Sequence, residues 1–506
     1  MSKLATVKEY FITRFTTLVP SREEFEAEKE ALNPFPALKQ MNKRQWQFFL
    51  VGFCAWTWDA FDFFAVSLNA AAIAESLGKN VSDVTWGITL VLMLRSVGAV
   101  LFGYLGDRYG RKLPYCLNMG LLVVLQIACG FVKTYEAFLG VRALFGIVLG
   151  GCFGVAAATS LEGVPVRARS VLSGVFQQGY ALGYLLVVVF NRAITDNSPH
   201  GWRAIFWFSA GPPVLLLAWR LCLPETDEFL QQQLHLQEGQ KAQFFKDAKK
   251  ALKQHWLKLI YMVILMSGFN FSSHGSQDLY PTLLTKQRGF GHDRSTVTNS
   301  VANLGAIAGG ILMGHFSGFV GRRLIVVIGC ICGGAMIYPW AFVKGVGGTN
   351  AGAFWLQFFV QGNWAIVPIH LTELSPPEFK AFVTGVSYQL GNLASSASST
   401  IESTIGERFP LYDEAGNQRD GVYDYGKVMA IFMGCVFAFL LVVTLLGPEN
   451  RNGNINYQLS DEEIKDLAEQ GKIVNTSEHH EYAEGGSSSG NEGTGEKDKA
   501  LIVHKE

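Results

Sequence analysis

The segment Gly103-Tyr-Leu-Gly-Asp107-Arg-Tyr-Gly110-Arg111-Lys112 joins two apolar stretches, and a similar segment, Gly314-His-Phe-Ser-Gly318-Phe-Val-Gly321-Arg322-Arg323, joins two others. The offset between them is 211 residues, the difference between 314 and 103. The same offset relates five further pairs: Glu162 and Glu373, Pro165 and Pro376, Arg169 and Lys380, Gly174 and Gly385, Gln178 and Gln389. So many matches at one offset indicate a duplicated chain, as in transporters that rock about a central site.

The apolar stretches themselves are long enough to cross a membrane. Of the 506 residues, 49% are hydrophobic and 17% are charged, and a membrane helix needs about 20 mainly apolar residues. We predict twelve spans, near 47–73, 84–106, 113–132, 137–160, 170–191, 202–223, 257–283, 297–319, 323–343, 351–372, 381–402 and 427–447. The predicted fold is therefore an all-α membrane protein with two pseudo-symmetric six-helix halves.

These spans divide the chain into five parts. We expect an N-terminal tail (1–46), a first six-helix half (47–223), a central loop (224–256), a second half (257–447) and a disordered tail (448–506) rich in Gly, Ser and Glu. The basic residues set the orientation by the positive-inside rule. Arg108, Arg111, Arg169, Arg322 and the central lysines fall on one side, and acidic residues of 403–425 on the other. Both tails and the central loop are therefore predicted to be cytoplasmic.

The composition excludes several classes of function. Lys+Arg 42 and Asp+Glu 42 give zero net charge, so the sequence indicates no nucleic-acid partner. The eight cysteines lie in or beside apolar stretches and lack the spacing of a metal site. The sequence has no nucleotide-binding loop and no visible set of nucleophile, base and orienting residue. We therefore predict neither an enzyme nor a cofactor-dependent protein, and we expect a lipid bilayer as its surroundings.

The repeated loop resembles the signature loop between the second and third spans of the major facilitator superfamily. Arg142-x-x-x-Gly146 resembles the motif of its fourth span, and Pro224-Glu225-Thr226 and Pro448-Glu449 resemble the ends of spans six and twelve. The resemblance implies the major facilitator fold and a gate between the halves. We assign the gate to Gly103, Asp107, Arg108, Gly110, Arg111, Glu162, Arg169 and Glu373. Because Gly318 replaces the acidic residue in the second half, we expect the first half to hold the gate more firmly.

Polar groups at membrane depth are costly and usually face a cavity. Asp59 and Asp62 lie about halfway along span one, Arg95 lies in span two and Arg142 in span four. A carboxylate at that depth must be paired or protonated, so it can act as an ion-pair partner and as a proton carrier. The alternative is a static ion pair that fixes the register of the helices.

Span seven carries the sharpest signal, from Asn270 to Thr282. At about 100° per residue, Asn270, His274 and Gln277 share one helix face, and Asp278 borders it. Subtracting 211 from 270 gives Asp59, so the polar positions of spans one and seven are pseudo-equivalent. In span eleven, Gln389 and Asn392 share a face. These side chains predict a polar pathway; the alternative is a hydrogen-bonded seam between helices.

The span-seven segment fits the pattern Asn-x-x-Ser/Thr-His-x-Ser/Thr-Gln-Asp-x-x-x-Thr at every fixed position. This resembles the fungal Jen-type lactate–pyruvate:proton symporters of the major facilitator superfamily. The resemblance implies uptake of short-chain mono- or dicarboxylates with protons at the plasma membrane. It also implies substrate binding by Arg95, Asn270, His274, Gln277, Asp278, Gln389 and Asn392.

A carboxylate away from water needs cationic or N–H donors, which Arg95 and the polar residues of spans seven and eleven offer. Candidates for proton coupling are Asp59, Asp62, Arg142, His274 and Asp278. Alternatives are a carrier of another organic or aromatic acid, or a nutrient sensor that does not transport. The central lysines are candidate ubiquitination sites for endocytosis, although lysines in a cytoplasmic loop are equally a topology signal.

Overall fold

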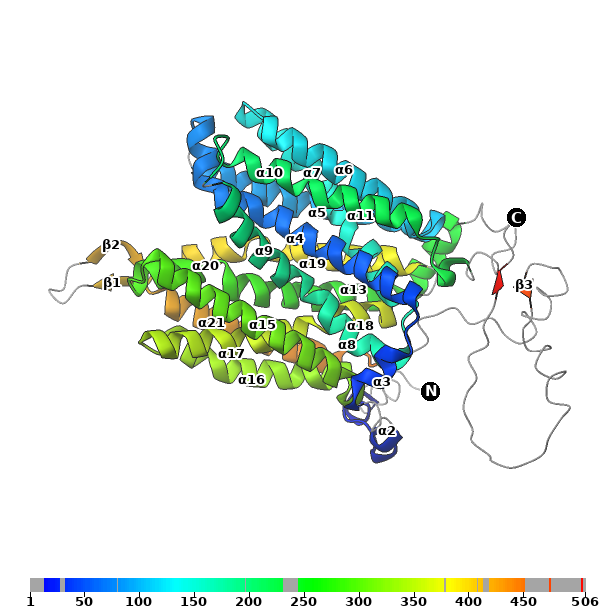
Figure 1. Cartoon of the computed structure of the whole chain (residues 1–506). Helices are drawn as coiled ribbons and strands as arrows, with labels where there is room; N and C mark the ends of the chain where they lie inside the picture. The colour runs from blue at the N-terminus through cyan, green and yellow to red at the C-terminus, as the bar shows by residue number, and fades with distance from the viewer. Residues whose placement is uncertain are drawn as a thin grey trace, which may run out of the picture.

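The computed structural model describes residues 13–27, 32–79, 81–195, 197–230, 244–376, 379–406, 408–412, 418–450, 473–474 and 502–503. The Gly/Ser-rich stretch of the C-terminal tail, Lys241 of the central loop and the acidic residues Glu407, Asp413 and Glu414 lie outside these residues. Figure 1 shows two bundles of long helices lying side by side, as the duplicated sequence predicts.

The first bundle contains spans one to six. Asn42 caps the first long helix through a reciprocal capping box with Gln45, and Gly78 ends it in the left-handed conformation that favours glycine. Two short helices precede the bundle. The helices are α2 (Arg22–Ala27), α3 (Pro34–Lys39), α4 (Lys43–Leu77), α5 (Val81–Tyr109), α6 (Lys112–Phe131), α7 (Tyr135–Leu161), α8 (Val166–Gln177), α9 (Gly179–Ile194), α10 (Arg203–Ser209) and α11 (Gly211–Cys222).

The second bundle contains spans seven to twelve. Its helices are α13 (Phe244–Gln277), α14 (Tyr280–Thr282), the π-helical turn η3 (Leu283–Gln287), α15 (His292–Val320), α16 (Arg322–Phe342), α17 (Val346–Trp364), α18 (Val367–Leu374), α19 (Lys380–Ser395), α20 (Ser398–Gly406) and α21 (Tyr425–Leu446). The strands β1 (Pro410–Tyr412) and β2 (Gln418–Tyr423) pair antiparallel between α20 and α21. A further pair, β3 (Ile473–Val474) and β4 (Ile502–Val503), follows the bundle. The major facilitator fold predicted from the sequence is confirmed.

Ten described segments have the length and hydropathy of a membrane span, against the twelve predicted. The two others are spans ten and eleven, each of which is divided between two helices. Span ten breaks between α17 and α18, next to Pro368, and span eleven breaks between α19 and α20. Helix α13 begins at Phe244, but its apolar part begins at His255, close to the predicted boundary.

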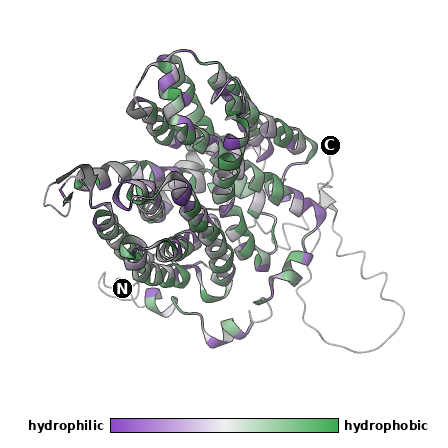
Figure 2. Ribbon diagram, turned by 60° about the vertical axis from the view of Figure 1, so that its left-hand side comes forward, coloured by the Kyte–Doolittle hydropathy of each residue, from purple (hydrophilic) through white to green (hydrophobic). Residues whose placement is uncertain are grey.

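The surface of both bundles is apolar. Trp86, Val124, Leu215 and Tyr338 are each more than 60% exposed, and Figure 2 shows hydrophobic residues along the helices of both bundles. Such a belt on a soluble protein would promote aggregation, whereas it suits the hydrocarbon core of a bilayer. The chain is therefore a multi-pass membrane protein.

The duplicated loops form duplicated turns. Gly110 separates α5 from α6 with a φ of 94°, and Gly321 separates α15 from α16 with a φ of 105°. Only glycine takes these values without strain. We call the end of the bundle that carries these two turns the motif end. The β1–β2 pair lies at the opposite end, which we call the hairpin end (Figure 1).

Candidate functional site

The first bundle contains a buried ion pair between spans one and two. Arg95 on α5 donates from Nη2 to Asp59 Oδ2 on α4 at 3.2 Å, and the two side chains are 3% and 0% exposed. The guanidinium also lies over the Phe63 ring, 5.2 Å from its centroid. Asp59 Oδ1 and Arg95 Nε have no hydrogen-bond partner among the described residues. Each partner thus keeps one polar atom available to a ligand or a water molecule.

A second polar group lies deeper in the first bundle. Asp62, Gln126 on α6 and Arg142 on α7 are all fully buried. Neither carboxylate oxygen of Asp62 and no guanidinium nitrogen of Arg142 has a hydrogen-bond partner among the described residues. The Arg142 guanidinium lies 4.3 Å above the Phe145 ring, and Asp62 is within electrostatic range. An unpaired carboxylate is costly at this depth, so Asp62 and its neighbour Arg142 stay candidates for proton coupling.

The second bundle holds a chain of polar side chains across α13 and α19. His274 Nδ1 contacts the Asp278 carboxylate at 3.2 Å, and its Nε2 contacts Asn392 Oδ1 at 3.3 Å. Asn392 Nδ2 then donates to Gln389 Oε1 at 3.4 Å. As oriented, both ring nitrogens face oxygen atoms, which suits the doubly protonated imidazole. We call Asp278, His274, Asn392 and Gln389 the span-seven network.

Two residues predicted for the site hydrogen-bond elsewhere. Asn270 donates to the Met266 carbonyl of its own helix at 2.9 Å. Gln277 donates to Gln357 Oε1 on α17 at 3.1 Å, and Gln357 donates in turn to Ser276. Asn270 and Gln277 therefore lie outside the span-seven network, although they are on the same helix as His274. A helix with two neighbours distributes its polar groups between them.

Sequence analysis missed two groups of polar residues. Gln357 and Gln361 on α17 are buried and bond Ser276 and Ser273, and their spacing of four residues could have signalled a polar face. Glu402 on α20 is fully buried. It stands at the end of a predicted span, where the sequence alone gave no reason to separate it from the acidic loop that follows.

The two bundles meet beside these groups. Ser96, the neighbour of Arg95, donates to the Gln389 carbonyl at 3.2 Å, and Arg95 is within electrostatic range of His274. Tyr388, the neighbour of Gln389, stacks on Phe153 with 3.9 Å between the ring centroids, and it contacts Trp56 edge-on. A guanidinium from the first bundle and an imidazole from the second thus lie within electrostatic range of each other where the bundles meet.

The motif end is closed by contacts between the bundles. Asp107 accepts hydrogen bonds from the backbone N–H groups of Ala381 and Phe382 on α19, at 3.1 and 2.8 Å. From the other side, Arg322 donates to Ser170 on α8 at 2.8 Å. Toward the hairpin end, by contrast, the Asp278 side chain is 37% exposed. The span-seven network is therefore reached from the hairpin end.

Most predicted gate residues make buried contacts at the motif end, which we call the buried network. Arg111 pairs with Asp107 at 3.1 Å and with Glu162 at 2.6 Å, and Arg322 pairs with Glu373 at 2.8 Å. Gly103 packs against the backbone of Phe382. Arg169 donates to the Val164 carbonyl at 2.8 Å. Arg108 differs, because it lies over the rings of Tyr104 and Tyr109 and outside this network.

Glutamates that follow each bundle cap the duplicated turns. Glu225 accepts from the Lys112 N–H at 3.0 Å. Glu449 accepts from the N–H groups of Arg322 and Arg323 at 3.3 and 2.9 Å. A carboxylate at a helix N-terminus is favoured by the helix dipole. Close to Glu225, burial and then the nearby Glu162 raise the pKa of Glu228 to about 7.

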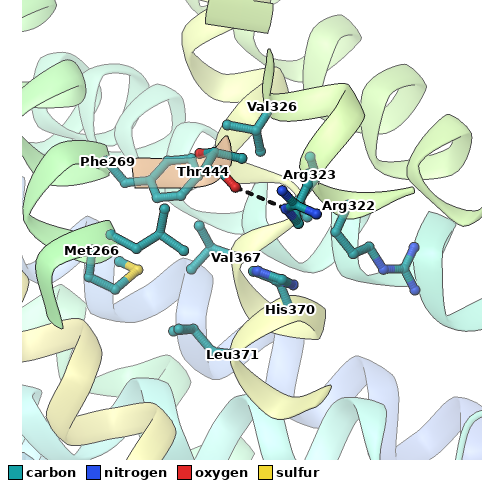
Figure 3. A pocket seen from close by; sticks show the side chains of 11 residues that line it. Met266, Phe269, Arg322, Arg323, Val326, Val367, His370, Leu371 and Thr444 are labelled. Carbon is teal, nitrogen blue, oxygen red and sulfur yellow. Dashed lines mark hydrogen bonds between the residues drawn. The ribbon is translucent and has the colours of Figure 1, made fainter. Parts of the chain in front are cut away.

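Figure 3 shows a cavity at the motif end of the second bundle. Met266, Phe269, Val326, Val367 and Leu371 form its apolar walls. Arg322, Arg323 and His370 lie at its other side, where Arg323 donates to the Thr444 carbonyl (Figure 3). None of the predicted substrate-binding residues lines this cavity.

Comparisons with known proteins agree with this architecture. The model of the family "Sugar (and other) transporter" matches residues 42–455. The chain is 40% identical over 481 residues to the "Carboxylic acid transporter protein homolog" of Saccharomyces cerevisiae, covering 92% of this chain and 77% of that protein. It is 24% identical to the "Probable 4-methylmuconolactone transporter" of Cupriavidus pinatubonensis, covering 82% and 94% of the two chains.

Among solved structures, the proton:xylose symporter XylE superimposes with a TM-score of 0.67 at 15% identity, covering 84% of this chain and 99% of that one. At this identity the likeness shows the fold alone. The yeast relative confirms the resemblance to the fungal carboxylate permeases, and the prediction that the chain is a transporter and not an enzyme is confirmed by its family. The chain belongs to the Sugar (and other) transporter family of the major facilitator superfamily.

Proposed function

We propose that this protein is a proton-coupled symporter of short-chain carboxylates at the plasma membrane. Its substrates would be lactate, pyruvate, acetate or small dicarboxylates such as succinate and malate. In this proposal the motif end and both termini face the cytoplasm, and the hairpin end faces outside. The observation that carries the proposal is the buried Arg95 guanidinium, which lies within electrostatic range of His274 of the span-seven network and whose Nε has no hydrogen-bond partner among the described residues.

The chemistry of these groups supports an anionic substrate. A guanidinium can hold a carboxylate through two parallel hydrogen bonds, which a lysine cannot. The amides of Gln389 and Asn392 add neutral donors, and Gln389 Nε2 has no partner among the described residues. The similarity to the yeast carboxylic acid transporter homolog supports the same class of substrate. Asn270 and Gln277 would hold α13 in position, and the substrate would meet Arg95 and the span-seven network before it meets these two side chains.

The proton is required by energetics. Uptake of an anion into a negative-inside cell costs about 2.3 kcal/mol per charge for each 100 mV. A proton that moves with the substrate cancels that cost for a monocarboxylate. Asp59 and Asp62 in the first bundle, and His274 with Asp278 in the second, are the candidate carriers, and Arg142 would take part in the coupling through its charge. Asp59 could release Arg95 to the substrate on taking up a proton, which would couple the two events.

The transport cycle follows from the closed motif end. Substrate and proton would enter from the hairpin end, where Asp278 is exposed, and bind between the bundles. Opening the motif end would then break the Asp107 bonds to α19 and the bond from Arg322 to Ser170. Both ligands would leave into the cytoplasm. The central lysines stay candidates for ubiquitination, and a cell-biological assay of endocytosis would test them.

Uptake of labelled acids into reconstituted vesicles tests the proposal. We expect lactate or another short-chain acid to accumulate when the outside is acid, and the accumulation to collapse when a protonophore removes the gradient. A panel that includes aromatic acids distinguishes a carrier of larger organic acids. A sensor that does not transport would bind the acid without accumulating it. Accumulation of larger or aromatic acids instead of short-chain acids, or binding without accumulation, would contradict the proposal.

A further inference from the structure

The second bundle contains a carboxyl group that the proposed mechanism does not use. Glu402 on α20 is 0% exposed. Neither of its carboxylate oxygens has a hydrogen-bond partner among the described residues. An ionised carboxylate without a donor or a counter-ion is very costly in such surroundings. The neutral carboxylic acid is therefore the form that fits this site.

The surroundings of Glu402 make ionisation harder still. Helix α20 packs against α13 and α21, and Asp278 at the end of α13 is the charged side chain that acts on Glu402. In the last three turns of α13, beside Asp278, the titratable group is His274, which is bound to Asp278. Two carboxyl groups so placed resist holding two negative charges at once.

Among the described residues, the start of α21 supplies no counter-ion to Glu402. Asp424 accepts from Gln287 and from the Lys427 N–H. The Lys427 ammonium lies over the Phe409 ring at 4.4 Å, and Tyr425 is a buried neutral phenol. The charged groups at this end of α21 are thus engaged with partners other than Glu402.

The duplication shows that the fold does not require an acid here. Subtracting 211 from 402 gives Asn191 on α9. Its side-chain oxygen accepts from Asn69 at 2.7 Å and from Thr195 at 2.8 Å. The equivalent position in the first bundle is therefore a neutral, hydrogen-bonded amide. An orphan carboxyl at the same place in the second bundle calls for another explanation.

We propose that Glu402 is a proton site of the second bundle, which exchanges its proton with Asp278 at the mouth of the span-seven network. The O–H bond of Glu402 breaks as an O–H bond forms on Asp278, so the total charge of the pair does not change. Asp278, at 37% exposure, then connects the buried site to the hairpin end. This inference rests on the proposed proton coupling and adds a carrier to it.

The test compares the wild type with Glu402→Gln in proteoliposomes. The membrane potential is clamped at zero, labelled lactate is the probe, and the pH gradient is varied. Each coupled proton raises the limiting accumulation tenfold per pH unit, because one unit is worth 1.36 kcal/mol. In Glu402→Gln we expect the limiting accumulation of lactate to fall about tenfold per pH unit of the gradient, and counterflow exchange to continue. Glu402→Asp, which can still titrate, should restore the wild-type limit.

The matched control is Glu75→Gln, which removes an exposed carboxyl near the hairpin end of α4 and should change nothing. An unchanged accumulation limit in Glu402→Gln would overturn the inference, because Glu402 would then keep its proton throughout the cycle. If the wild type itself does not accumulate lactate, the proposed function fails. Infrared spectroscopy of the purified protein separates the two failures. The wild type should show a protonated-carboxyl band that disappears as the pH rises, and Glu402→Gln should lack this band. If Glu402→Gln keeps the band, the inference is also overturned.

Discussion

The two halves share a fold and an offset of 211 residues, yet they use different chemistry at equivalent positions. At the motif end Asp107 of the first half reaches two N–H groups of α19. Its counterpart, Gly318, has no side chain, and a Cβ there would lie 2.8 Å from Ser170 Oγ. In the middle of the bundle, Asp59 of the first half forms an ion pair, whereas its counterpart Asn270 bonds its own helix.

This difference shows which parts of a duplicated transporter are constrained by the scaffold and which by the task. The arginine–glutamate pairs Arg111–Glu162 and Arg322–Glu373 are retained in both halves, because each closes the same turn. The charged pair Asp59–Arg95 exists in the first half alone among the described residues. We infer that the first half supplies the guanidinium that meets the anion, and the second half supplies the imidazole and the amides.

The sharpest way to break this comparison is to remove Arg95. Arg95→Ala should abolish uptake, and Arg95→Lys should leave a carrier with roughly tenfold to hundredfold weaker affinity, since a charge-assisted hydrogen bond contributes about 1.5–3 kcal/mol. Uptake kinetics and surface abundance are measured together. The double variant Arg95→Ala/Asp59→Asn controls for the unpaired Asp59 left behind. Normal affinity in Arg95→Ala would remove Arg95 from the site.

The acidic residues of span one test whether the first half also carries the proton. In Asp59→Asn and Asp62→Asn, made separately, we expect accumulation against a gradient to be lost in the variant that removes the carrier. Counterflow exchange of preloaded substrate should survive, because exchange needs no net proton movement. If both variants still concentrate substrate, the proton site lies in the second half.

The gate comparison can be sharpened with Asp107→Asn. Without the charged acceptor, the Ala381 and Phe382 amides lose a charge-assisted bond of about 1.5–3 kcal/mol. We expect their hydrogen–deuterium exchange to speed up roughly tenfold or more. Arg108→Gln, in the same loop but outside the buried network, is the control. Equal protection in Asp107→Asn would mean that the contact does not hold the motif end closed.

His274 tests the second half. His274→Gln keeps hydrogen bonding but removes titration. We expect affinity to fall by roughly twofold to tenfold, in line with one neutral hydrogen bond, and the pH dependence of affinity to flatten. Substrate binding by the purified protein across a pH series measures both. An unchanged profile would make His274 a seam residue between α13 and α19.

The smallest expected effect concerns Glu228, outside the membrane spans. Its pKa rises from 4.5 to about 7 in the folded protein, chiefly through burial. Between these values the folded state binds more protons than the unfolded state, so stability falls as the pH rises through this window. Glu228→Gln should therefore flatten the decline in melting temperature from pH 5 to 8, by about one to two degrees. Asp227→Asn, whose carboxyl is 61% exposed, should follow the wild type.

The sequence alone determined the scaffold. The repeated loops, the constant offset and the lengths of the apolar stretches were sufficient to predict twelve spans in two halves, because membrane burial and a fixed helical rise leave few other solutions. The polar residues of the site, Asp59, Arg95, His274, Asp278, Gln389 and Asn392, were also recognisable, because a polar side chain at membrane depth is costly and usually has a function.

The tertiary structure alone decided the partners. Sequence spacing placed Asn270, His274 and Gln277 on one face, but the positions of α17 and α19 determined that Gln277 bonds Gln357 while His274 bonds Asn392. It also determined that Arg108 lies outside the gate contacts and that Glu402 is buried with no donor among the residues that the structure describes. Helix periodicity fixes the direction of a side chain about its own axis. Its partner depends on which neighbouring helix lies there, and that follows from the packing of the whole bundle.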